Sequence, residues 1–367
     1  MKEKLIIKNF GPIKNVELEL GRFNMLIGEN STGKSTIAKV LDSIYNFGSL
    51  TEGEGASKMI RFSELSDISY FKKKLAVYEI DRYITKESLI NFHGKDIKFN
   101  LEKGIIYSNI EELVKKSDYH LYNNTTYIPA DRIATSLFSS ATWPGLIDIE
   151  EGRIDMPKYF LRFINLFERL KKGKDEFDFT EILGIRFRQD DGIDKIILKD
   201  GTIIGINASA SAIQSNLSLS VIVDHQADKS GKTTFIIEEP ELNLFPAVQN
   251  KLIQYLVDKT MNYGNNMLLT THSPYILTSL NNMIYAYNVG QRNAEEVKQI
   301  IDEKYWLNPD EVSVYMMLPS DESEEIVNIF DKEEGIIMAE KIDDISRKLN
   351  SDFDLVQDIE LAISEDK

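Results

Sequence analysis

Eight residues near the start of the chain have the types and spacing of a loop that binds nucleotide phosphates. They follow the apolar run 23–27, precede a helical pattern, and read Gly28-Glu29-Asn30-Ser31-Thr32-Gly33-Lys34-Ser35. The glycines let successive backbone N–H groups turn toward the phosphates, and the following helix directs the positive end of its dipole at them. Lys34 would reach the β- and γ-phosphates, and Ser35 would hold Mg2+. The sequence therefore predicts an ATP and Mg2+ site with the nucleotide contacts Asn30, Ser31, Thr32, Gly33, Lys34, Ser35 and Thr36; a chance match is the alternative.

Two carboxylates follow a second apolar segment far along the chain. Residues 233–237 are apolar or β-branched, which predicts a strand, and Glu238 and Glu239 come directly after it. Beside the phosphate loop, Glu238 would join the Mg2+ shell and Glu239 would accept a proton from the water that attacks the γ-phosphate. The alternative, a solvated acidic turn, accounts for the charges but not for their place after a buried strand.

A lone histidine ends a third apolar strand. Residues 266–269 run into Thr270-Thr271-His272-Ser273-Pro274, so His272 can face the same nucleotide and donate a hydrogen bond to its γ-phosphate. A lone histidine is more often structural, and its position after the carboxylate strand is what favours the catalytic interpretation.

Together these segments resemble the ABC-type AAA family ATPases of the OLD (overcoming lysogenization defect) group, relatives of SMC and RecF proteins that include many bacterial anti-phage defence ATPases. The resemblance covers residues 1–45 and 185–290. It rests on the opening run 5–13, the phosphate loop, the run 237–246 and the run 270–274, and the segment 127–132 also matches. It implies an α/β fold, namely a P-loop ABC-type ATPase head whose mixed sheet is flanked by helices, with an α-rich insertion and a small α+β C-terminal tail.

The resemblance also implies a signature segment, which the run 207–214 matches in degenerate form. In the family this segment begins a helix whose N-terminus contacts the γ-phosphate held by the other subunit. Ser211 and Gln214 fill its polar positions, whereas Ala212 and Ile213 stand where glycines are usual. ATP would then join two copies head to tail in a twofold dimer; a plain Ser/Ala-rich helix start is the alternative. Asn243 stands where relatives often carry histidine, which favours slow hydrolysis and a role for ATP as a conformational clamp.

The pattern along the chain predicts four segments. They are a first core part over 1–45, a lid insertion over 46–184 with a core strand near 125–132, a second core part over 185–290, and an acidic α+β tail over 291–367. The insertion lacks the sustained heptads of long SMC-type arms and includes an amphipathic helix near 161–172. Alternating segments at 185–189, 195–198 and 203–206 predict antiparallel hairpins that lead to the signature helix. The apolar run 283–289 predicts a last core strand.

The tail shows strand patterns at 312–318 and 325–330 and an amphipathic acidic helix at 339–349. OLD-type proteins often carry a Toprim nuclease in this region. The tail lacks the spaced carboxylates on buried strands that two-metal chemistry requires, so we expect the nuclease to be a separate polypeptide.

Composition limits the other function classes. The 367 residues are 42% apolar and include no cysteine, which excludes disulfides and cysteine metal sites and fits a reducing cytoplasm. No signal-like or membrane-length apolar run occurs, so we expect a cytoplasmic protein without membrane contact. Residues 321–367 carry −11 of the net charge of −16, which leaves the remainder close to neutral. Basic clusters at 72–74, 115–116 and 171–174 leave DNA contact open, with solvated helix faces as the alternative.

These observations support one preferred function and two alternatives. The preferred function is an ATPase subunit that dimerises around ATP and scaffolds or restrains a separately encoded effector, plausibly a nuclease, in anti-phage defence. The alternatives are a RecF-like ATP-dependent DNA-repair clamp and a nucleotide sensor with little hydrolysis.

Overall fold

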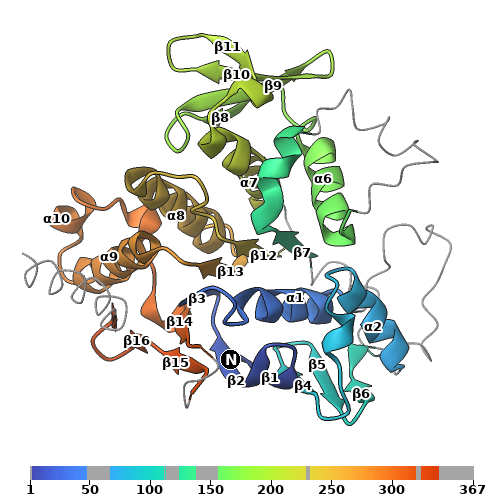
Figure 1. Ribbon diagram of the computed structural model, residues 1–367. Helices are drawn as coiled ribbons and strands as arrows, with labels where there is room; N and C mark the ends of the chain where they lie inside the picture. Colours follow the sequence, from blue (N-terminus) through green and yellow to red (C-terminus); the bar gives the residue numbers. More distant parts are fainter. Residues whose placement is uncertain are drawn as a thin grey trace, which may run out of the picture.

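A six-stranded mixed sheet lies at the centre of the molecule (Figure 1). The computed structural model describes residues 2–47, 67–110, 112, 124–137, 156–228, 232–319 and 324–338. The strand order is β15-β14-β3-β13-β12-β7; β14 to β7 run parallel, and β15 pairs antiparallel with β14. The strands are β3 (Phe23–Gly28), β7 (Asn124–Ile128), β12 (Thr233–Glu238), β13 (Asn266–Thr271), β14 (Val312–Met317) and β15 (Ile326–Asn328).

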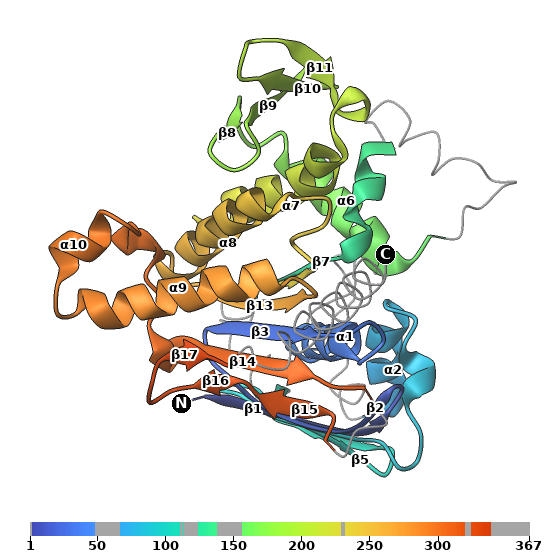
Figure 2. The same ribbon diagram turned by 60° about the vertical axis from the view of Figure 1, so that its left-hand side comes forward.

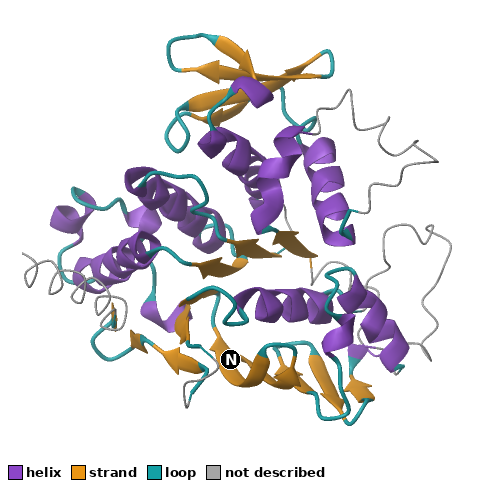
Figure 3. Cartoon of the chain, in the orientation of Figure 1, coloured by secondary structure: helices purple, strands orange, loops and turns teal. Residues whose placement is uncertain are grey.

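Both faces of this sheet are covered, which explains why its central strands are almost continuously apolar. In β3, Met25 and Ile27 belong to one core cluster, and Leu26 between them belongs to the other. Helix α1 covers the second face, and α7, α8 and α9 cover the first (Figure 3). The helices are α1 (Lys34–Tyr45), α7 (Ser211–Ala227), α8 (Pro246–Met261) and α9 (Pro274–Gly290).

The strands that carry the predicted site end at one edge of this sheet. β3 leads into α1, β12 into α8 and β13 into α9, and the three strands are parallel neighbours in the order β3-β13-β12. In such sheets, ligands bind outside the carboxyl ends of the strands. The topology therefore brings the phosphate loop together with two segments that lie more than two hundred residues further along the chain.

A second, five-stranded antiparallel sheet lies on the far side of α1 (Figure 2). Its order is β2-β1-β4-β5-β6, so the N-terminal hairpin pairs with strands from the predicted insertion. Phe47, buried after the end of α1, packs its ring 5.3, 5.6 and 5.2 Å from those of Tyr70, Phe71 and Phe99. The described part of the insertion from 68 to 108 is therefore continuous with the core. The strands of this second sheet are β1 (Glu3–Phe10), β2 (Ile13–Leu20), β4 (Leu89–His93), β5 (Lys98–Glu102) and β6 (Ile105–Ser108), and the helix beside it is α2 (Ile68–Ala76).

A four-stranded antiparallel meander precedes α7, in the order β11-β10-β9-β8. This confirms the predicted hairpins, and the amphipathic helix α6 (Lys158–Leu170) and the core strand β7 are confirmed as well. The meander leads through a short 3-10 turn at 206–208 into α7, as the sequence pattern predicts. Its strands are β8 (Phe177–Phe179), β9 (Ile185–Asp190), β10 (Ile193–Leu198) and β11 (Ile203–Gly205).

The predicted strand at 283–289 is wrong, because these residues form the C-terminal half of α9. The buried residues Ile276, Leu280 and Ile284 recur every four positions, which is the spacing of one helix face. A short apolar run does not distinguish a strand from the buried stripe of a helix, and here the longer periodicity decides.

The region after α9 adds two strands to the central sheet. All six residues of β14 are buried, and β14 pairs with β3, so this part of the predicted tail belongs to the core. The predicted pairing of 312–318 with 325–330 is confirmed by β14 and β15. Further elements are α10 (Ala294–Lys298), β16 (Phe330–Asp331) and β17 (Ile336–Ile337), and the predicted helix at 339–349 lies outside the described residues. Among the described residues, no helix is both long enough and apolar enough to cross a membrane.

Candidate nucleotide site

The phosphate loop occupies the turn between β3 and α1, in the strand–loop–helix order that the sequence predicts. Gly33 precedes the helix with φ of 94°, a left-handed conformation that glycine adopts without cost. At Gly28, a Cβ would lie 2.3 Å from the carbonyl oxygen of Met317, so a side chain cannot fit there. Glu29, Asn30 and Ser31 are exposed at the tip, whereas Gly33 and Thr36 are buried. The loop is therefore packed at its base and open where phosphates would bind.

Lys34 lies inside this loop. Its Nζ donates hydrogen bonds to the carbonyl oxygens of Gly28 and Glu29 over 3.0 and 2.6 Å. Burial lowers the pKa of Lys34 to about 8, although the carboxylates of Glu239, Glu241, Glu238 and Glu29 oppose this shift. A polyanion in the loop would favour the charged form of Lys34 and therefore fits this environment.

Glu238 is the last residue of β12 and is buried beside the start of α1. Burial raises its pKa, opposed by the charge of Lys39 and by the Ser35 hydroxyl. Its Oε1 atom is buried and has no hydrogen-bond partner. A buried carboxylate oxygen without a partner is costly, and a hydrated Mg2+ held by Ser35 would compensate it. These two residues therefore fit the predicted metal position.

Glu239 and His272 meet at the ends of neighbouring strands. Glu239 Oε1 lies 3.5 Å from His272 Nε2, and about 30% of each side chain is exposed. Glu239 has φ of 44°, in the left-handed region that is unfavourable for a residue with a Cβ. Its amide donates to the carbonyl oxygen of Thr270 over 2.8 Å, which ties the turn to β13. The structure thus brings together the two residues predicted to be catalytic, both still accessible to a ligand.

The sequence prediction did not assign a role to Glu241, although it is part of the same acidic run. Its Oε1 atom accepts hydrogen bonds from the Thr271 hydroxyl at 2.7 Å and from the His272 amide at 2.8 Å. Glu241 therefore fixes the backbone that carries His272. A third carboxylate after a buried strand was the available sequence signal, but its partners are set by the pairing of β12 with β13.

Arg132 is a second residue whose role the sequence prediction did not identify. It follows β7, is fully buried, and donates to the carbonyl oxygens of Glu238 and Glu239 over 2.7 and 2.6 Å. No pattern in the run 127–132 indicates that this arginine reaches the carboxylate strand.

The signature residues lie at the start of α7. Ser211 is the first helical residue and is exposed. Gln214 lies one turn further on, where its amide group donates to the carbonyl oxygen of Ser209 at 2.8 Å and accepts from the Ser136 hydroxyl at 3.1 Å. Ser211 is therefore accessible to a second molecule, whereas the Gln214 side chain is hydrogen-bonded to residues of its own chain. Contact of either residue with a nucleotide of another copy stays a prediction.

Asn243 joins the segment after the carboxylates to the same helix. Its φ is 61°, a left-handed conformation that asparagine tolerates better than most residues. Its Nδ2 donates to the Ser215 hydroxyl at 2.6 Å, and Asn216 Nδ2 donates to the carbonyl oxygen of Leu242 at 3.0 Å. These contacts give a local reason for asparagine at this position and place the start of α7 near the edge where β12 ends.

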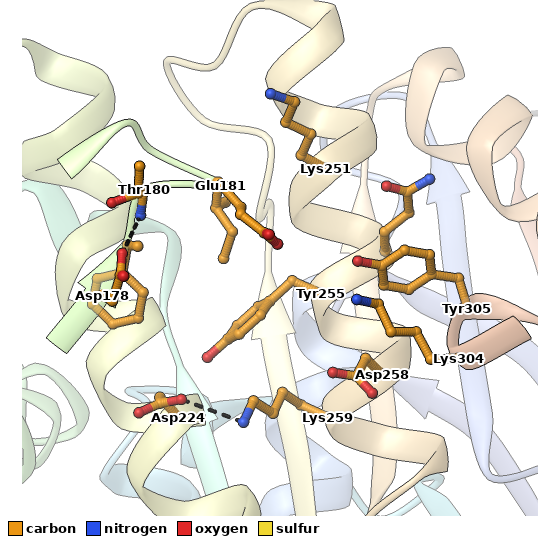
Figure 4. Close-up of a pocket in the computed structure, with 13 residues that line it drawn as sticks. Asp178, Thr180, Glu181, Asp224, Lys251, Tyr255, Asp258, Lys259, Lys304 and Tyr305 are labelled. Atoms are coloured by element: carbon orange, nitrogen blue, oxygen red, sulfur yellow. Dashed lines mark hydrogen bonds and ion pairs between the residues drawn. The ribbon is translucent and has the colours of Figure 1, made fainter. Parts of the chain in front are cut away.

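A cavity of about 570 Å3 lies away from this edge, between the turn after β8, helix α8 and the segment around Tyr305 (Figure 4). Four carboxylates line it, and Lys259 is paired there with Asp224 at 3.3 Å. Three lysines, Lys251, Lys259 and Lys304, line the cavity as well, so its charges nearly balance. Because no residue of the phosphate loop lines it, we do not assign the nucleotide to it.

The parallel sheet, the phosphate loop and the adjoining carboxylates define a P-loop ATPase fold. Comparison with protein families agrees: the family described as AAA ATPase domain matches residues 1–140 and 56–277. These overlapping matches extend over most of the chain, and this protein belongs to the AAA ATPase domain family. It therefore contains an ATP-binding ATPase domain.

The curated relatives share a shorter stretch. The xylose import ATP-binding proteins XylG of Shigella flexneri serotype 5b (strain 8401) and of Escherichia coli O6:K15:H31 (strain 536 / UPEC) are each 38% identical over 107 residues. The match covers 26% of this chain and 20% of each relative. The chain thus spans about a fifth of the length of the curated relatives it matches.

Two solved structures show distant similarity. One is the SmcHead bound to the C-winged helix domain of ScpA, at 14% identity and a TM-score of 0.45, covering 76% of this chain and 92% of that one. The other is the Smc head domain with an extended coiled coil bound to the C-terminal domain of ScpA, derived from Pyrococcus furiosus. It has 12% identity and a TM-score of 0.44 and covers 95% of this chain and 99% of that one.

Proposed function

We propose that this protein hydrolyses Mg-ATP slowly and that two copies close around the nucleotide to scaffold or restrain a separately encoded effector, a nuclease, in bacterial anti-phage defence. The observation that carries the enzymatic part is the meeting of Glu239 and His272, 3.5 Å apart, at the sheet edge where β3 ends and the phosphate loop begins. Membership of the AAA ATPase domain family supports nucleotide binding. It is not by itself an argument for the dimer or for the effector.

Each residue of this edge has a distinct task in the proposed reaction. Lys34 and the loop amides bind the phosphates, and Ser35 with Glu238 holds the metal shell. Glu239 accepts a proton from the attacking water, and His272 donates a hydrogen bond to the γ-phosphate. Mg2+, when bound, supplies neutralisation of the phosphate charge. The open tip of the loop and the partial exposure of Glu239 and His272 leave the reacting groups accessible.

In the proposed dimer, residues of the second copy would complete the nucleotide site. Ser211 is exposed at the N-terminus of α7, where a helix dipole can meet a phosphate of the partner. Phe245, 75% exposed, and Tyr275, 53% exposed, stand at the starts of α8 and α9, close in sequence to Glu239 and His272. In a twofold dimer, each subunit would cover these two aromatic side chains of the other subunit.

The effector is inferred from the resemblance to OLD-type defence ATPases, which supplies the class of system and not its members. Purification of the full chain from a strain with its native operon should recover a second polypeptide, in an amount that depends on Mg-ATP. Recovery of this chain alone, with and without Mg-ATP, would contradict the effector role. An ATP-dependent footprint on duplex DNA that weakens steeply with salt would instead support the repair-clamp alternative.

A further inference from the structure

Arg132 forms a bridge between strand β7 and the end of strand β12. Its side chain is fully buried, although arginine is among the residues least often found in protein interiors. Nη1 donates to the carbonyl oxygens of Pro129 at 3.1 Å and Glu238 at 2.7 Å, and Nη2 donates to that of Glu239 at 2.6 Å. The planar guanidinium thus holds two successive carbonyl groups at once, which a lysine cannot do in the same geometry.

The surroundings of Arg132 keep it in this position. Its own carbonyl oxygen accepts a hydrogen bond from the Thr135 hydroxyl at 2.7 Å. Burial lowers the pKa of Arg132 to about 10, and the nearby carboxylates of Glu241, Glu239, Glu238 and Asp131 oppose this shift. Arg132 therefore stays charged at neutral pH, among four acidic groups, and its hydrogen bonds to the carbonyls are charge-assisted.

The residue that Arg132 holds is under conformational strain. Glu239 adopts φ of 44°, and a residue with a Cβ pays for this region unless the surrounding structure enforces it. Its amide is fixed by the carbonyl oxygen of Thr270, and its carbonyl is fixed by Arg132. Both polar ends of the residue are therefore tied to neighbouring strands, and its side chain is directed toward His272.

We infer that Arg132 is a positioning residue for ATP hydrolysis: by holding the carbonyl groups of Glu238 and Glu239, it keeps Glu239 in the left-handed conformation that places its carboxylate beside His272. This inference rests on the proposed hydrolysis. Arg132 contacts the backbone and acts through Glu239, so its loss should lower turnover and leave nucleotide affinity nearly unchanged.

Arg22 provides a control with similar backbone contacts; its side chain is 31% exposed, and its Nη1 also pairs with Glu311 at 2.9 Å. Its Nη2 donates to the carbonyl oxygens of Thr260, Met261 and Asn265 over 3.1, 3.2 and 3.3 Å. It therefore makes a comparable set of backbone contacts, but just before β3, at the opposite edge of the sheet. Arg22→Lys removes a carbonyl-binding guanidinium without approaching Glu239.

The test compares the full-length protein with Arg132→Lys and Arg22→Lys in two measurements. Hydrogen–deuterium exchange without nucleotide should become faster in peptides that cover 238–242 for Arg132→Lys and stay unchanged there for Arg22→Lys. Steady-state hydrolysis should show kcat lowered about 100-fold for Arg132→Lys, with the ATP Kd within about threefold of the parent, because a displacement of the general base of about 1 Å costs this much. In the Glu239→Gln background, Arg132→Lys should add little further loss, because both changes affect one step.

The outcomes separate this inference from the proposed function. Parent-like exchange at 238–242 in Arg132→Lys would overturn the positioning role, and so would parent-like turnover. Equal losses for Arg132→Lys and Arg22→Lys would overturn it too, because they would reflect general destabilisation. If the parent itself binds ATP without turnover, the hydrolysis proposal fails, and the exchange measurement still decides whether Arg132 holds the Glu239 backbone.

Discussion

Glu241 accepts a hydrogen bond from the backbone amide of His272 over 2.8 Å, and the same carboxylate oxygen accepts one from the Thr271 hydroxyl over 2.7 Å. Residues 31 positions apart in sequence are thus joined across the ends of β12 and β13. The bond fixes the turn from which the imidazole faces Glu239. Glu241 thus supports the histidine, beside the two carboxylates at the end of β12 that we propose as a metal ligand and a general base.

Replacement of Glu241 by leucine should lower both stability and turnover. It leaves the Thr271 hydroxyl and the His272 amide without their acceptor, at a cost of about 1–3 kcal/mol in the free energy of unfolding. Urea unfolding and steady-state hydrolysis measure the two effects. Glu241→Gln is the control, because its amide oxygen can still accept both bonds and should retain most of the stability. Equal stability of the parent and Glu241→Leu would show that this bond is not needed.

Nucleotide affinity should fall as the pH rises above about 8. Burial lowers the pKa of Lys34 to about 8, so the free protein loses the ammonium charge as the pH passes that value. Bound phosphate favours the charged form, so binding above pH 8 should take up a proton and weaken by up to about tenfold per pH unit. Calorimetric titration from pH 7 to 9.5 in two buffers of different ionisation enthalpy measures both effects.

The lowered pKa of Lys34 also determines how the free energy of unfolding changes with pH. Since the pKa of an unfolded lysine is near 10.5, the folded state binds fewer protons between pH 8 and 10.5. Lys34 therefore lowers the free energy of unfolding below pH 8, and this destabilisation is relieved as the pH rises from 8 to 10.5. Lys34→Arg, which keeps its charge, should flatten the affinity profile, and Lys34→Ala should lose affinity at every pH. Equal ATP affinity in the parent and Lys34→Ala would overturn the phosphate-loop assignment.

Glu239→Gln should separate binding from hydrolysis. The amide cannot accept the proton of the attacking water, so turnover should fall by about 10²- to 10⁴-fold while the ATP Kd stays close to that of the parent. Rapid-quench hydrolysis and equilibrium nucleotide binding measure the two quantities. If the parent already fails to turn over and Glu239→Gln changes nothing, the protein is a nucleotide sensor rather than an ATPase.

Phe47→Ala should destabilise the contact between α1 and the five-stranded sheet. The buried ring of Phe47 packs on Tyr70, Phe71 and Phe99, and removal of such a side chain costs about 3–5 kcal/mol in the free energy of unfolding. Tyr107→Ala, in the same sheet but 62% exposed, should change it by less than about 0.5 kcal/mol. Equal chemical denaturation midpoints for the two variants would contradict this packing.

Local sequence patterns predict the elements that carry the nucleotide site, because strand, loop and helix are each encoded within a few residues. Gly33, Glu239 and His272 can therefore be located from the order of residues along the chain. The supports were not predicted, since Arg132 and Glu241 act across neighbouring strands and their partners depend on the strand order. The strand predicted at 283–289 failed for a related reason: its apolar residues belong to a helix face that extends back to Ile276.

The way the four predicted segments combine in the fold also depends on pairing between strands far apart in the sequence. The alternating residues of β14 predict a strand, yet no local pattern indicates that it lies beside β3 in the central sheet. Likewise, β4 pairs with β1 through a register that joins Leu5 to Phe92. Such contacts join residues far apart in the chain, so periodicity within either segment does not reveal them.

Light scattering on purified Glu239→Gln, with and without Mg-ATP, tests the central claim most directly. The proposed closure around nucleotide predicts twice the monomer mass of 42.0 kDa with Mg-ATP and the monomer mass without it. Ser211→Arg in the same background should bind ATP and stay monomeric. A mass of 42.0 kDa for Glu239→Gln with ATP demonstrably bound would contradict the dimer and, with it, the proposed mechanism.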